Sequence, residues 1–254
     1  MRRLPSLLGA AVFAAGLVGS MAAPAFAHDS DHGSKHHGRS SYSRSEHHHD
    51  ERDHNHGRHD DADHGNPYRG ATVVRPGESI QAAIDAADAG DTIVVKSGTY
   101  AEQLVITKSV KLLSLGATLT PPAAPGDATP CSGGEPANDG ICVAGVFTVS
   151  PEGEVTVTDA VDNVVVAGFH IAGFSANGIV QIGGVNSVFF ANFAEDNAEY
   201  GIAAFSSTGT TVAFNKVTGA EEAGIYIGDS HPAAAKVFAN QVTDNALGIF
   251  VRNA

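Results

Sequence analysis

The dipeptide Gly-Ile recurs four times in the second half of the chain, at residues 178–179, 201–202, 224–225 and 248–249. Successive copies lie 23, 23 and 24 residues apart. Each copy opens a short apolar segment, and these segments read GIVQIGG, GIAAFSS, GIYIGDS and GIFVRNA. A repeat of this length indicates that one small structural unit is built several times and that the copies stack on one another.

The residue types within the repeat decide which stacked architecture it forms. A period near 23 residues suits a leucine-rich horseshoe or a parallel β-helix. The horseshoe needs several leucines in each repeat, whereas the four repeats from Phe169 onward contain only Leu247. Gly, Ile, Val, Phe and Asn recur instead, which is typical of short strands joined by tight bends. The repeat therefore predicts an all-β fold, a parallel β-helix with coils of about 23 residues.

Stacked coils place equivalent residues above one another at the ordinary interstrand spacing of about 4.8 Å. We expect the isoleucines of the repeat to fill the interior, and the asparagines that follow an apolar pair to form an amide ladder at a bend. Side chains alternate along a strand, so the residue after each isoleucine should point outward and be exposed. The interior set is Ile179, Ile202, Ile225 and Ile249; the ladder is Asn192, Asn215 and Asn240; the outward set is Val180, Ala203, Tyr226 and Phe250.

Both ends of such a stack need cover, because an open coil exposes apolar residues and unpaired strand edges. Near the start, Ile80, Ala83, Ile84 and Ala87 form one apolar helical face, and Ser79 is suited to the N-cap. We predict an N-terminal capping helix over residues 79–89. No closing segment follows the last Gly-Ile strand, so we expect a β-helix domain at 71–254 that is incomplete at its C-terminus. Its uncapped last coil would allow end-to-end association.

The first 27 residues have the pattern of a secretory signal peptide. Arg2 and Arg3 precede an apolar stretch, Leu7 to Met21, and an Ala-x-Ala cleavage site at residues 25–27. The stretch is short for the alternative, a membrane anchor, and no other segment could span a membrane. We therefore expect a secreted protein, extracellular or at the cell surface. In that oxidising compartment Cys131 and Cys142 should form a disulfide, since the alternative zinc site has no nearby histidine.

Residues 28–70 form a histidine-rich segment with eleven of the thirteen histidines and almost no apolar side chains. Such a composition predicts disorder. Imidazoles bind Zn, Cu and Ni, so His47, His48, His49, His54 and His56 are candidate metal ligands, and the alternative is a solvated spacer. The chain carries a net charge of −13, which disfavours nucleic acid, anionic membranes and strongly anionic polymers as partners.

Two parts of the sequence resemble a known group. The segment IQAAIDAADAGDTIVVKSGTYAEQLVITKSVKLLS and the coils from Val161 onward are similar to right-handed parallel β-helix proteins of the pectin-lyase-like superfamily. This resemblance implies a right-handed β-helix. It also implies a range of activities, because the group includes pectate and pectin lyases, pectin methylesterases, mannuronan epimerases, glycosidases and the copper-handling accessory proteins of nitrous oxide reductase.

The residues do not select one of these activities. Lyases of the group hold calcium on clustered aspartates beside a basic residue, so Ca is expected only if this chain is a lyase. Here the carboxylates fall mostly in bends, and Arg252 is the only basic residue on a Gly-Ile strand. The epimerase motif stops after Tyr200-Gly201-Ile202, and the converging aspartates and arginine of a methylesterase cannot be assembled.

The remaining candidate is a binding surface on the last two coils. Aromatic rings flanked by polar groups can hold sugar rings, and the residues with this pattern are Tyr226, Phe250, Asp229 and Arg252. We therefore favour a secreted β-helix protein that binds or scaffolds extracellular polysaccharide or cell-surface material. One alternative is a polysaccharide lyase or related carbohydrate-active enzyme whose catalytic coils are missing. A second is metal handling through the histidine-rich segment.

Overall fold

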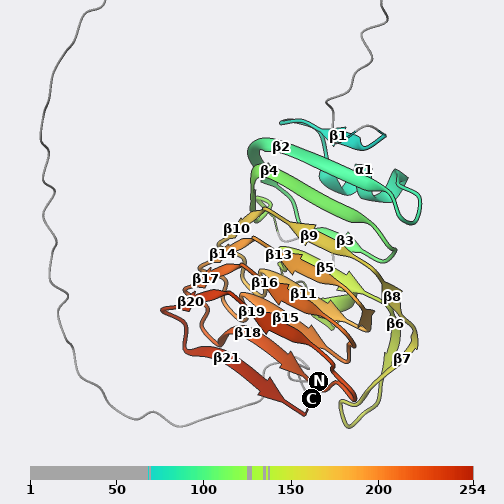
Figure 1. Cartoon of the computed structure of the whole chain (residues 1–254), viewed down its shortest axis with the longest axis vertical. Coiled ribbons are helices and arrows are strands. Elements are labelled where there is room, and N and C mark those ends of the chain that lie inside the picture. Colours follow the sequence, from blue (N-terminus) through green and yellow to red (C-terminus); the bar gives the residue numbers. More distant parts are fainter. Residues whose placement is uncertain (1–67, 69, 125–127, 134–135, 137, 254) are drawn as a thin grey trace, which may run out of the picture. The chain divides into compact units, whose positions relative to one another are not determined.

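The computed structural model describes residues 68, 70–124, 128–133, 136 and 138–253. Within these ranges short parallel strands lie in successive coils, with one α-helix and one antiparallel hairpin beside them (Figure 1). The first elements are β1 (Thr72–Val74), α1 (Ile80–Ala86), β2 (Thr92–Ala101), β3 (Leu104–Ile106), β4 (Lys111–Thr120), the 3-10 turn Pro130–Ser132 and β5 (Ile141–Ala144). Next come β6 (Val146–Val149), β7 (Val155–Asp159), β8 (Val161–Asp162), β9 (Val165–Ala167), β10 (His170–Ala172), β11 (Ile179–Ile182), β12 (Gly184–Val185), β13 (Val188–Phe190) and β14 (Phe193–Glu195). The last are β15 (Ile202–Phe205), β16 (Thr211–Ala213), β17 (Lys216–Thr218), β18 (Ala223–Gly228), β19 (Lys236–Phe238), β20 (Gln241–Thr243) and β21 (Leu247–Arg252).

Two sheets run along the stack of coils. The larger sheet orders its strands β19-β16-β13-β9-β4-β10-β14-β17-β20, and β4 also pairs with β2, which in turn pairs with β1. The second sheet has the order β21-β18-β15-β11-β5-β3 and contains every Gly-Ile strand. Its register places Ile179 opposite Ile202, and Ile225 opposite both Ile202 and Ile249. This pairing of equivalent residues confirms the predicted parallel β-helix.

The interior column is confirmed for three of its four predicted isoleucines, and the fourth, Ile249, lies on the edge strand and is half exposed. Ile179, Ile202 and Ile225 are fully buried in the main core, together with Phe169 and Phe189. The column continues to Ile141, which pairs with Ile179 and belongs to a fifth Gly-Ile dipeptide that the regular spacing did not reveal.

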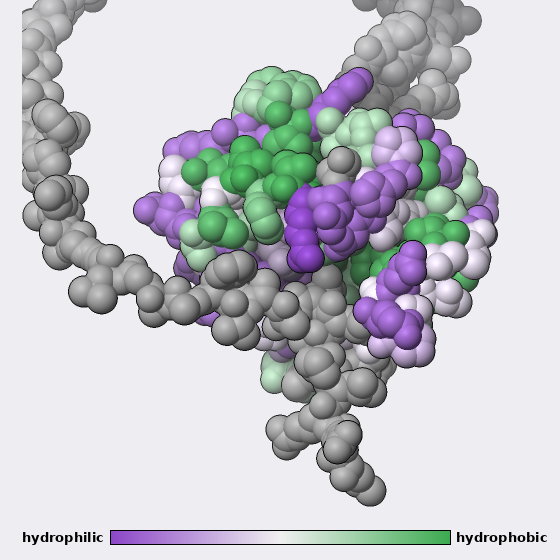
Figure 2. Space-filling view, turned by 90° about the horizontal axis from the view of Figure 1, so that it is seen from below, coloured by the Kyte–Doolittle hydropathy of each residue, from purple (hydrophilic) through white to green (hydrophobic). Residues whose placement is uncertain are grey.

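The strand β21 forms one edge of the second sheet. Ile249 is 51% exposed, because no strand of the described chain pairs with the outer edge of β21. The view in Figure 2 is taken from below Figure 1, where β21 lies, and it shows hydrophobic side chains gathered in one area. Exposed apolar residues of β21 include Leu247, Ile249, Phe250 and Val251. End-to-end association through this strand stays a prediction.

The predicted asparagine ladder lies at the bend between the two arms of the larger sheet. The residue before each asparagine has a left-handed backbone, with φ of 52° at Ala191, 58° at Phe214 and 55° at Ala239. Asn215 Oδ1 accepts hydrogen bonds from Asn192 N at 2.9 Å and from Asn192 Nδ2 at 3.1 Å. Asn240 Oδ1 bonds to Asn215 in the same way, at 2.9 and 3.0 Å. The ladder therefore satisfies buried backbone groups that the bend removes from the sheets.

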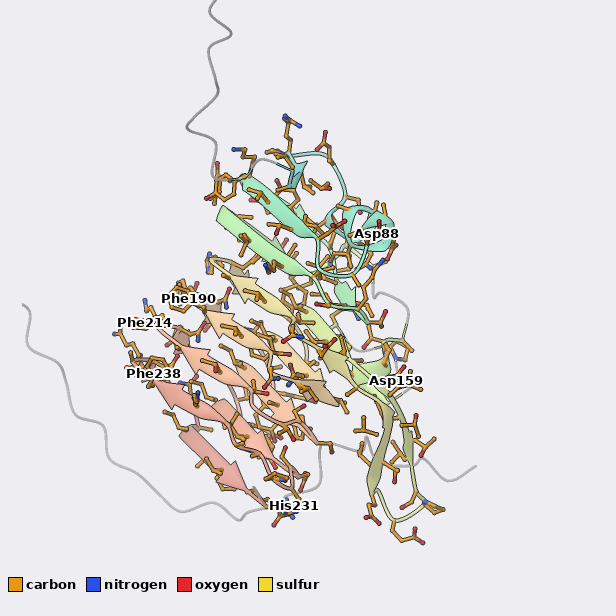
Figure 3. The ribbon with its side chains drawn as sticks, turned by 45° about the vertical axis from the view of Figure 1, so that its right-hand side comes forward. Asp88, Asp159, Phe190, Phe214, His231 and Phe238 are labelled. Carbon is orange, nitrogen blue, oxygen red and sulfur yellow. A yellow bond between two sulfur atoms is a disulfide. The ribbon has the colours of Figure 1, made fainter. Side chains whose placement is uncertain are left out.

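Three phenyl rings cover the outer side of the same bend. Phe190, Phe214 and Phe238 are 43%, 55% and 49% exposed and form the column labelled in Figure 3. Ring centroids lie 5.3 Å apart for the first pair and 5.8 Å apart for the second. The rings are tilted or edge-on to one another rather than coplanar. Such contacts add modest stability to the bend.

Helix α1 lies close to the first strands. Ser79 accepts a hydrogen bond from Ala82 N at 3.1 Å, as an N-cap does. Ile80 and Ile84 are buried in the main core, and Gln81 bonds to the backbone of Val105 in β3 through both ends of its amide. The helix ends at Ala86, three residues before the predicted end, and its role as a cap stays a prediction. No helix in the described ranges is long and apolar enough to cross a membrane.

The ladder yields a stability prediction. Replacing Asn215 with Ala removes the acceptor for Asn192 N–H and the donor to the carbonyl oxygen of Phe189. Each buried group left without a partner costs about 1–3 kcal/mol, so we expect the variant to lose about 2–4 kcal/mol of unfolding free energy. Urea unfolding measures this loss. The control is Gln241→Ala on exposed β20, where a change within about 0.5 kcal/mol is expected. Equal losses in the two variants would contradict the ladder's role.

Candidate functional site

A second layer of protein covers the outer face of the Gly-Ile sheet. Val180 and Ala203 are fully buried and Tyr226 is 3% exposed, so the prediction that these side chains are exposed is wrong. They do point away from the main core, but they form a second apolar cluster with Cys131, Cys142 and Phe205. Phe147 of β6 and Val155 of β7 pack against this cluster. Only Phe250, on the edge strand, is exposed as predicted, at 39%.

The predicted disulfide between Cys131 and Cys142 is present and holds this layer in place. Both cysteines are buried, and their Cα atoms lie 5.8 Å apart. The turn Pro130–Ser132 is closed by reciprocal hydrogen bonds between Thr129 and Ser132. A cross-link over a separation of 11 residues contributes about 3 kcal/mol in the chain-entropy model. The loop is therefore anchored to the β5 strand of the coil beneath it.

A pocket of about 470 Å³ opens between this loop, the β6–β7 hairpin and the coils. The hairpin contributes Phe147 and Glu154 to its wall, and the coils contribute Phe205. Polar residues from the start and the end of the Gly-Ile strands complete the lining, among them Asp139, Asn177, Glu199, Asp229, His231 and Arg252. Apolar rings and a few polar groups from several segments thus line one open pocket.

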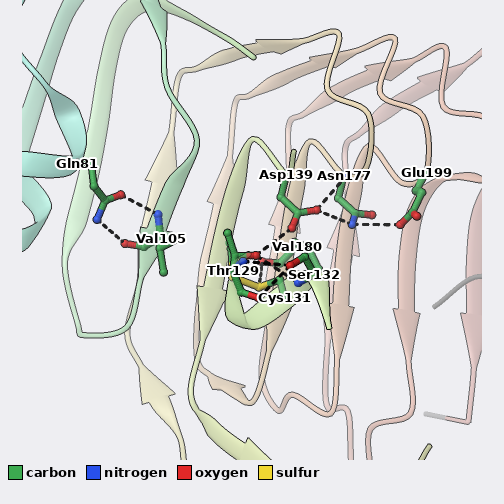
Figure 4. The surroundings of a disulfide bond; sticks show 10 residues. Gln81, Val105, Thr129, Cys131, Ser132, Asp139, Asn177, Val180 and Glu199 are labelled. Atoms are coloured by element: carbon green, nitrogen blue, oxygen red, sulfur yellow. Dashed lines mark hydrogen bonds between the residues drawn. A yellow bond between two sulfur atoms is a disulfide. The ribbon is translucent and has the colours of Figure 1, made fainter. Parts of the chain in front are cut away.

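One end of the pocket holds two carboxylates joined by an amide (Figure 4). Asn177 Nδ2 donates to Asp139 Oδ1 at 2.8 Å and to Glu199 Oε2 at 3.3 Å. Asp139 also accepts from Asn177 N at 3.2 Å and from the Thr129 hydroxyl at 3.3 Å. Asp139 is 1% exposed and Glu199 is half-buried. Asp139 therefore anchors the disulfide loop, whereas Glu199 remains partly accessible.

The environment at this end favours protonated groups. Burial raises the pKa of Asp139 above its ordinary value, against the opposing effect of its hydrogen bonds. Burial also raises the pKa of Glu199, and the nearby carboxylates of Asp139 and Glu222 raise it further. Tyr200 is 8% exposed, and burial together with its hydrogen bond to Glu222 raises its pKa strongly. Acidic groups thus lie close together here, and no Lys, Arg or His side chain of the described residues forms an ion pair with them.

The opposite end of the pocket lies at the ends of the last strands. Asp229 and Arg252 line it, together with His231 from the bend that follows β18. Asn253 Nδ2 donates to Asp229 Oδ1 at 3.0 Å. Of the four predicted carbohydrate-binding residues, two therefore reach the pocket. Tyr226 lies beneath it in the apolar cluster, with its ring 5.6 Å from the exposed ring of Phe250.

The predicted metal ligands of the histidine-rich segment lie outside the described residues, as do the predicted signal peptide and most of residues 28–70. Within the described ranges no group of three or more His, Cys, Asp or Glu side chains could hold a metal ion. His170 pairs with Phe193 in the larger sheet and forms a 2.8 Å contact with Glu195 Oε2. It lies on the larger sheet and does not line the pocket.

Asp139 and Asn177 were missed by the sequence analysis, although a signal for them exists. Each directly precedes a Gly-Ile dipeptide, as Tyr200 does one coil later. Residues at this position stack in register: Asn177 N donates to Asp139, and Tyr200 N donates to Asn177 Oδ1 at 3.2 Å. Aligning the repeats on the residue before Gly-Ile, with the fifth dipeptide included, would have placed these side chains together.

A family model for the right handed beta helix region matches residues 139–254. This region is a right-handed β-helix. The match begins at Asp139, the pocket carboxylate that precedes the first Gly-Ile strand, and it includes every coil that lines the pocket. No curated protein matches the sequence.

Three solved structures are similar to this chain at low sequence identity. A family 28 exopolygalacturonase of Yersinia enterocolitica matches with a TM-score of 0.43 and 16% identity, over 67% of this chain and 48% of its own. The A-module of mannuronan C-5 epimerase AlgE4 of Azotobacter vinelandii gives 0.34 and 17%, over 72% and 65%. The tailspike protein of Dettilon gives 0.33 and 14%, over 71% and 46%. The chain thus spans about half the length of the exopolygalacturonase.

The raised pKa of Glu199 predicts a pH-dependent stability difference. A carboxyl whose pKa is raised in the folded state costs no stability while protonated, and it destabilises the fold as pH rises from the ordinary value of 4.5 through the folded pKa. The Glu199→Gln variant lacks this charge. We therefore expect the melting temperature of the native protein, relative to the variant, to fall across that range. If the melting temperatures of the two proteins instead changed with pH in the same way, ionisation of Glu199 would not destabilise the fold and the prediction would be wrong.

Proposed function

We propose that this protein is exported and binds a short stretch of extracellular polysaccharide in the pocket under the β6–β7 hairpin. The observation that carries the proposal is the pocket itself, about 470 Å³ in volume, with Phe147 and Phe205 beside the polar groups of Glu199 and Arg252. Volumes of 300–1,000 Å³ with this mixture of apolar and polar lining are typical of small-molecule sites.

The chemistry of the lining suits a sugar ring. Aromatic rings pack against the C–H faces of sugars, and the phenyl rings of Phe147 and Phe205 supply such surfaces. Carboxylates accept hydrogen bonds from hydroxyl groups, while the Arg252 guanidinium donates them. This site replaces the exposed Tyr226–Phe250 surface that the sequence suggested, but it keeps Asp229 and Arg252.

Export is supported by the N-terminal sequence pattern and by the disulfide. A buried disulfide that anchors one wall of the binding pocket persists in an oxidising compartment. The same compartment contains the polysaccharides of cell surfaces and matrices. Metal binding by the histidine-rich segment remains a separate prediction, which zinc titration of chains with and without residues 28–66 would test.

Binding is predicted to depend on the pocket and not on other exposed aromatic residues. We expect Phe147→Ala and Arg252→Ala each to weaken binding about tenfold, the effect of losing roughly 1.4 kcal/mol of contact energy. The matched control is Phe238→Ala in the phenyl column outside the pocket, which should bind like the native protein. Affinity electrophoresis against a panel of neutral, acidic and amino polysaccharides measures the retention. If Phe238→Ala lost retention and the two pocket variants did not, the polysaccharide would bind at the phenyl column and not in the pocket.

A second candidate function is glycosidic bond cleavage. Asp139 and Glu199 each lie within 3.3 Å of the same amide nitrogen, so their bonded oxygens are at most about 6 Å apart. Paired carboxyls at about 5–10 Å, one of them protonated, are the machinery of glycoside hydrolysis. Binding is the better supported function, because Asp139 is 1% exposed and already bonded to Thr129 and Asn177.

Cleavage would be visible as new reducing ends when the polysaccharide that binds best is incubated with the protein. If Glu199 acts as a general acid, Glu199→Gln should lower the rate at least about 100-fold, a much larger effect than its loss of retention on the polysaccharide. Asp88→Asn, a matched removal of charge on an exposed residue near helix α1, serves as the control. No release of reducing ends by the native protein would leave binding as the function.

A further inference from the structure

We infer that the pocket selects a sugar that carries a protonated amine, and that Glu199 receives this amine. The inference rests on the proposed carbohydrate binding and names the class of sugar. It is argued from the hydrogen-bonding capacity and the charge of the groups around Glu199.

The described side-chain donors around Glu199 are bonded to other protein groups. The two N–H groups of the Asn177 side chain point to Asp139 and Glu199. The Thr129 hydroxyl donates to Asp139, and the Ser132 hydroxyl donates to Thr129 O at 3.0 Å. The Tyr200 hydroxyl is bonded to Glu222. A ligand at this end of the pocket therefore meets mainly hydrogen-bond acceptors, chiefly the carboxylate oxygens of Glu199.

Glu199 has most of that capacity. Among the described residues its side chain accepts one hydrogen bond, from Asn177 at 3.3 Å, a long contact, although a carboxylate can accept about four. It is half-buried and lines the pocket, so a ligand group can reach its free lone pairs. A ligand that satisfies Glu199 must donate several hydrogen bonds from a compact group, and an ammonium carries three N–H donors.

Charge points to the same group. The pocket is lined by four carboxyl side chains, those of Asp139, Glu154, Glu199 and Asp229, against the guanidinium of Arg252 and the imidazole of His231. Glu222 adds a further negative charge near Glu199. No Lys, Arg or His side chain of the described ranges forms an ion pair with Asp139, Glu199 or Glu222. A bound ammonium would supply the missing countercharge, whereas an acidic sugar would place another carboxylate beside these groups.

The test compares ligands that differ in this one group. Short glucosamine oligomers, their N-acetylated counterparts and galacturonate oligomers of equal length are titrated into the full chain by calorimetry at about pH 6, where an amine is protonated. N-acetylation removes the charge and two of the three donors but keeps the ring. We expect glucosamine oligomers to bind about tenfold more tightly than the acetylated ones, and galacturonate oligomers to bind most weakly.

Variants then locate the effect. Glu199→Gln should abolish the preference for the free amine, so that glucosamine oligomers and acetylated oligomers bind this variant with affinities within about twofold of each other. Asp88→Asn makes the same change of charge away from the pocket and should keep the preference. Melting curves of both variants establish that they are folded. A preference that survives Glu199→Gln, or is lost equally in Asp88→Asn, would overturn the assignment to Glu199.

The outcomes also separate this inference from the proposed function. Equal binding of acetylated and free-amine oligomers, or tighter binding of galacturonate, would overturn the amine preference while carbohydrate binding stands. Binding of none of the three would overturn the proposed function. Spermidine, an amine without a sugar ring, is titrated as the last ligand. If it bound as tightly as glucosamine oligomers, the site would accept amines in general and the assignment to a sugar would be overturned.

Discussion

The fold depends on one constraint, that residues 23–25 positions apart must occupy the same place in successive coils. Parallel pairing between coils satisfies the strand backbones, and it brings identical side chains into columns. A column of isoleucines can then be fully buried. At bends, where the backbone leaves the sheet, a column of asparagines replaces the lost hydrogen bonds, each side chain serving its neighbour one coil away. A change in the repeat length would break both columns at once, so the spacing is more informative than any single residue.

A departure from that spacing creates the site. Between Gly140-Ile141 and Gly178-Ile179 the chain inserts the β6–β7 hairpin before it resumes the coil. Together with the disulfide loop that precedes Gly140, this hairpin covers the outer face of the Gly-Ile sheet and buries Val180, Ala203 and Tyr226. The coil remains regular beneath the insertion, because Ile141 still pairs with Ile179. The pocket is thus a space left between a repetitive scaffold and a non-repetitive cover.

This division explains what the sequence could predict. Periodicity reports which side chains face the interior, so the isoleucine column, the asparagine ladder and the outward direction of Tyr226 were predictable. It does not report what lies over the outer face, because the covering segment belongs to no repeat. Exposure of Tyr226 was therefore inferred wrongly, while Phe250, beyond the cover on the edge strand, is exposed. The disulfide could be predicted from compartment and spacing alone, but the contact of its loop with Asn177 through Asp139 depends on the three-dimensional stacking.

The cluster around Asn177 shows how stability and binding meet in this structure. Burying Asp139 raises its pKa, an energetic cost that three hydrogen bonds and the disulfide loop offset. Had the cluster served stability alone, a neutral side chain in place of Glu199 would satisfy Asn177 without adding a second negative charge. Glu199 instead lies beside Asp139 and Glu222, which together with burial raise its pKa, and among the described residues it accepts a single side-chain hydrogen bond. The acceptor oxygens of Glu199 gain hydrogen bonds once a ligand group with several N–H or O–H donors enters the pocket. This gain is the physical basis for regarding this end of the pocket as a binding site.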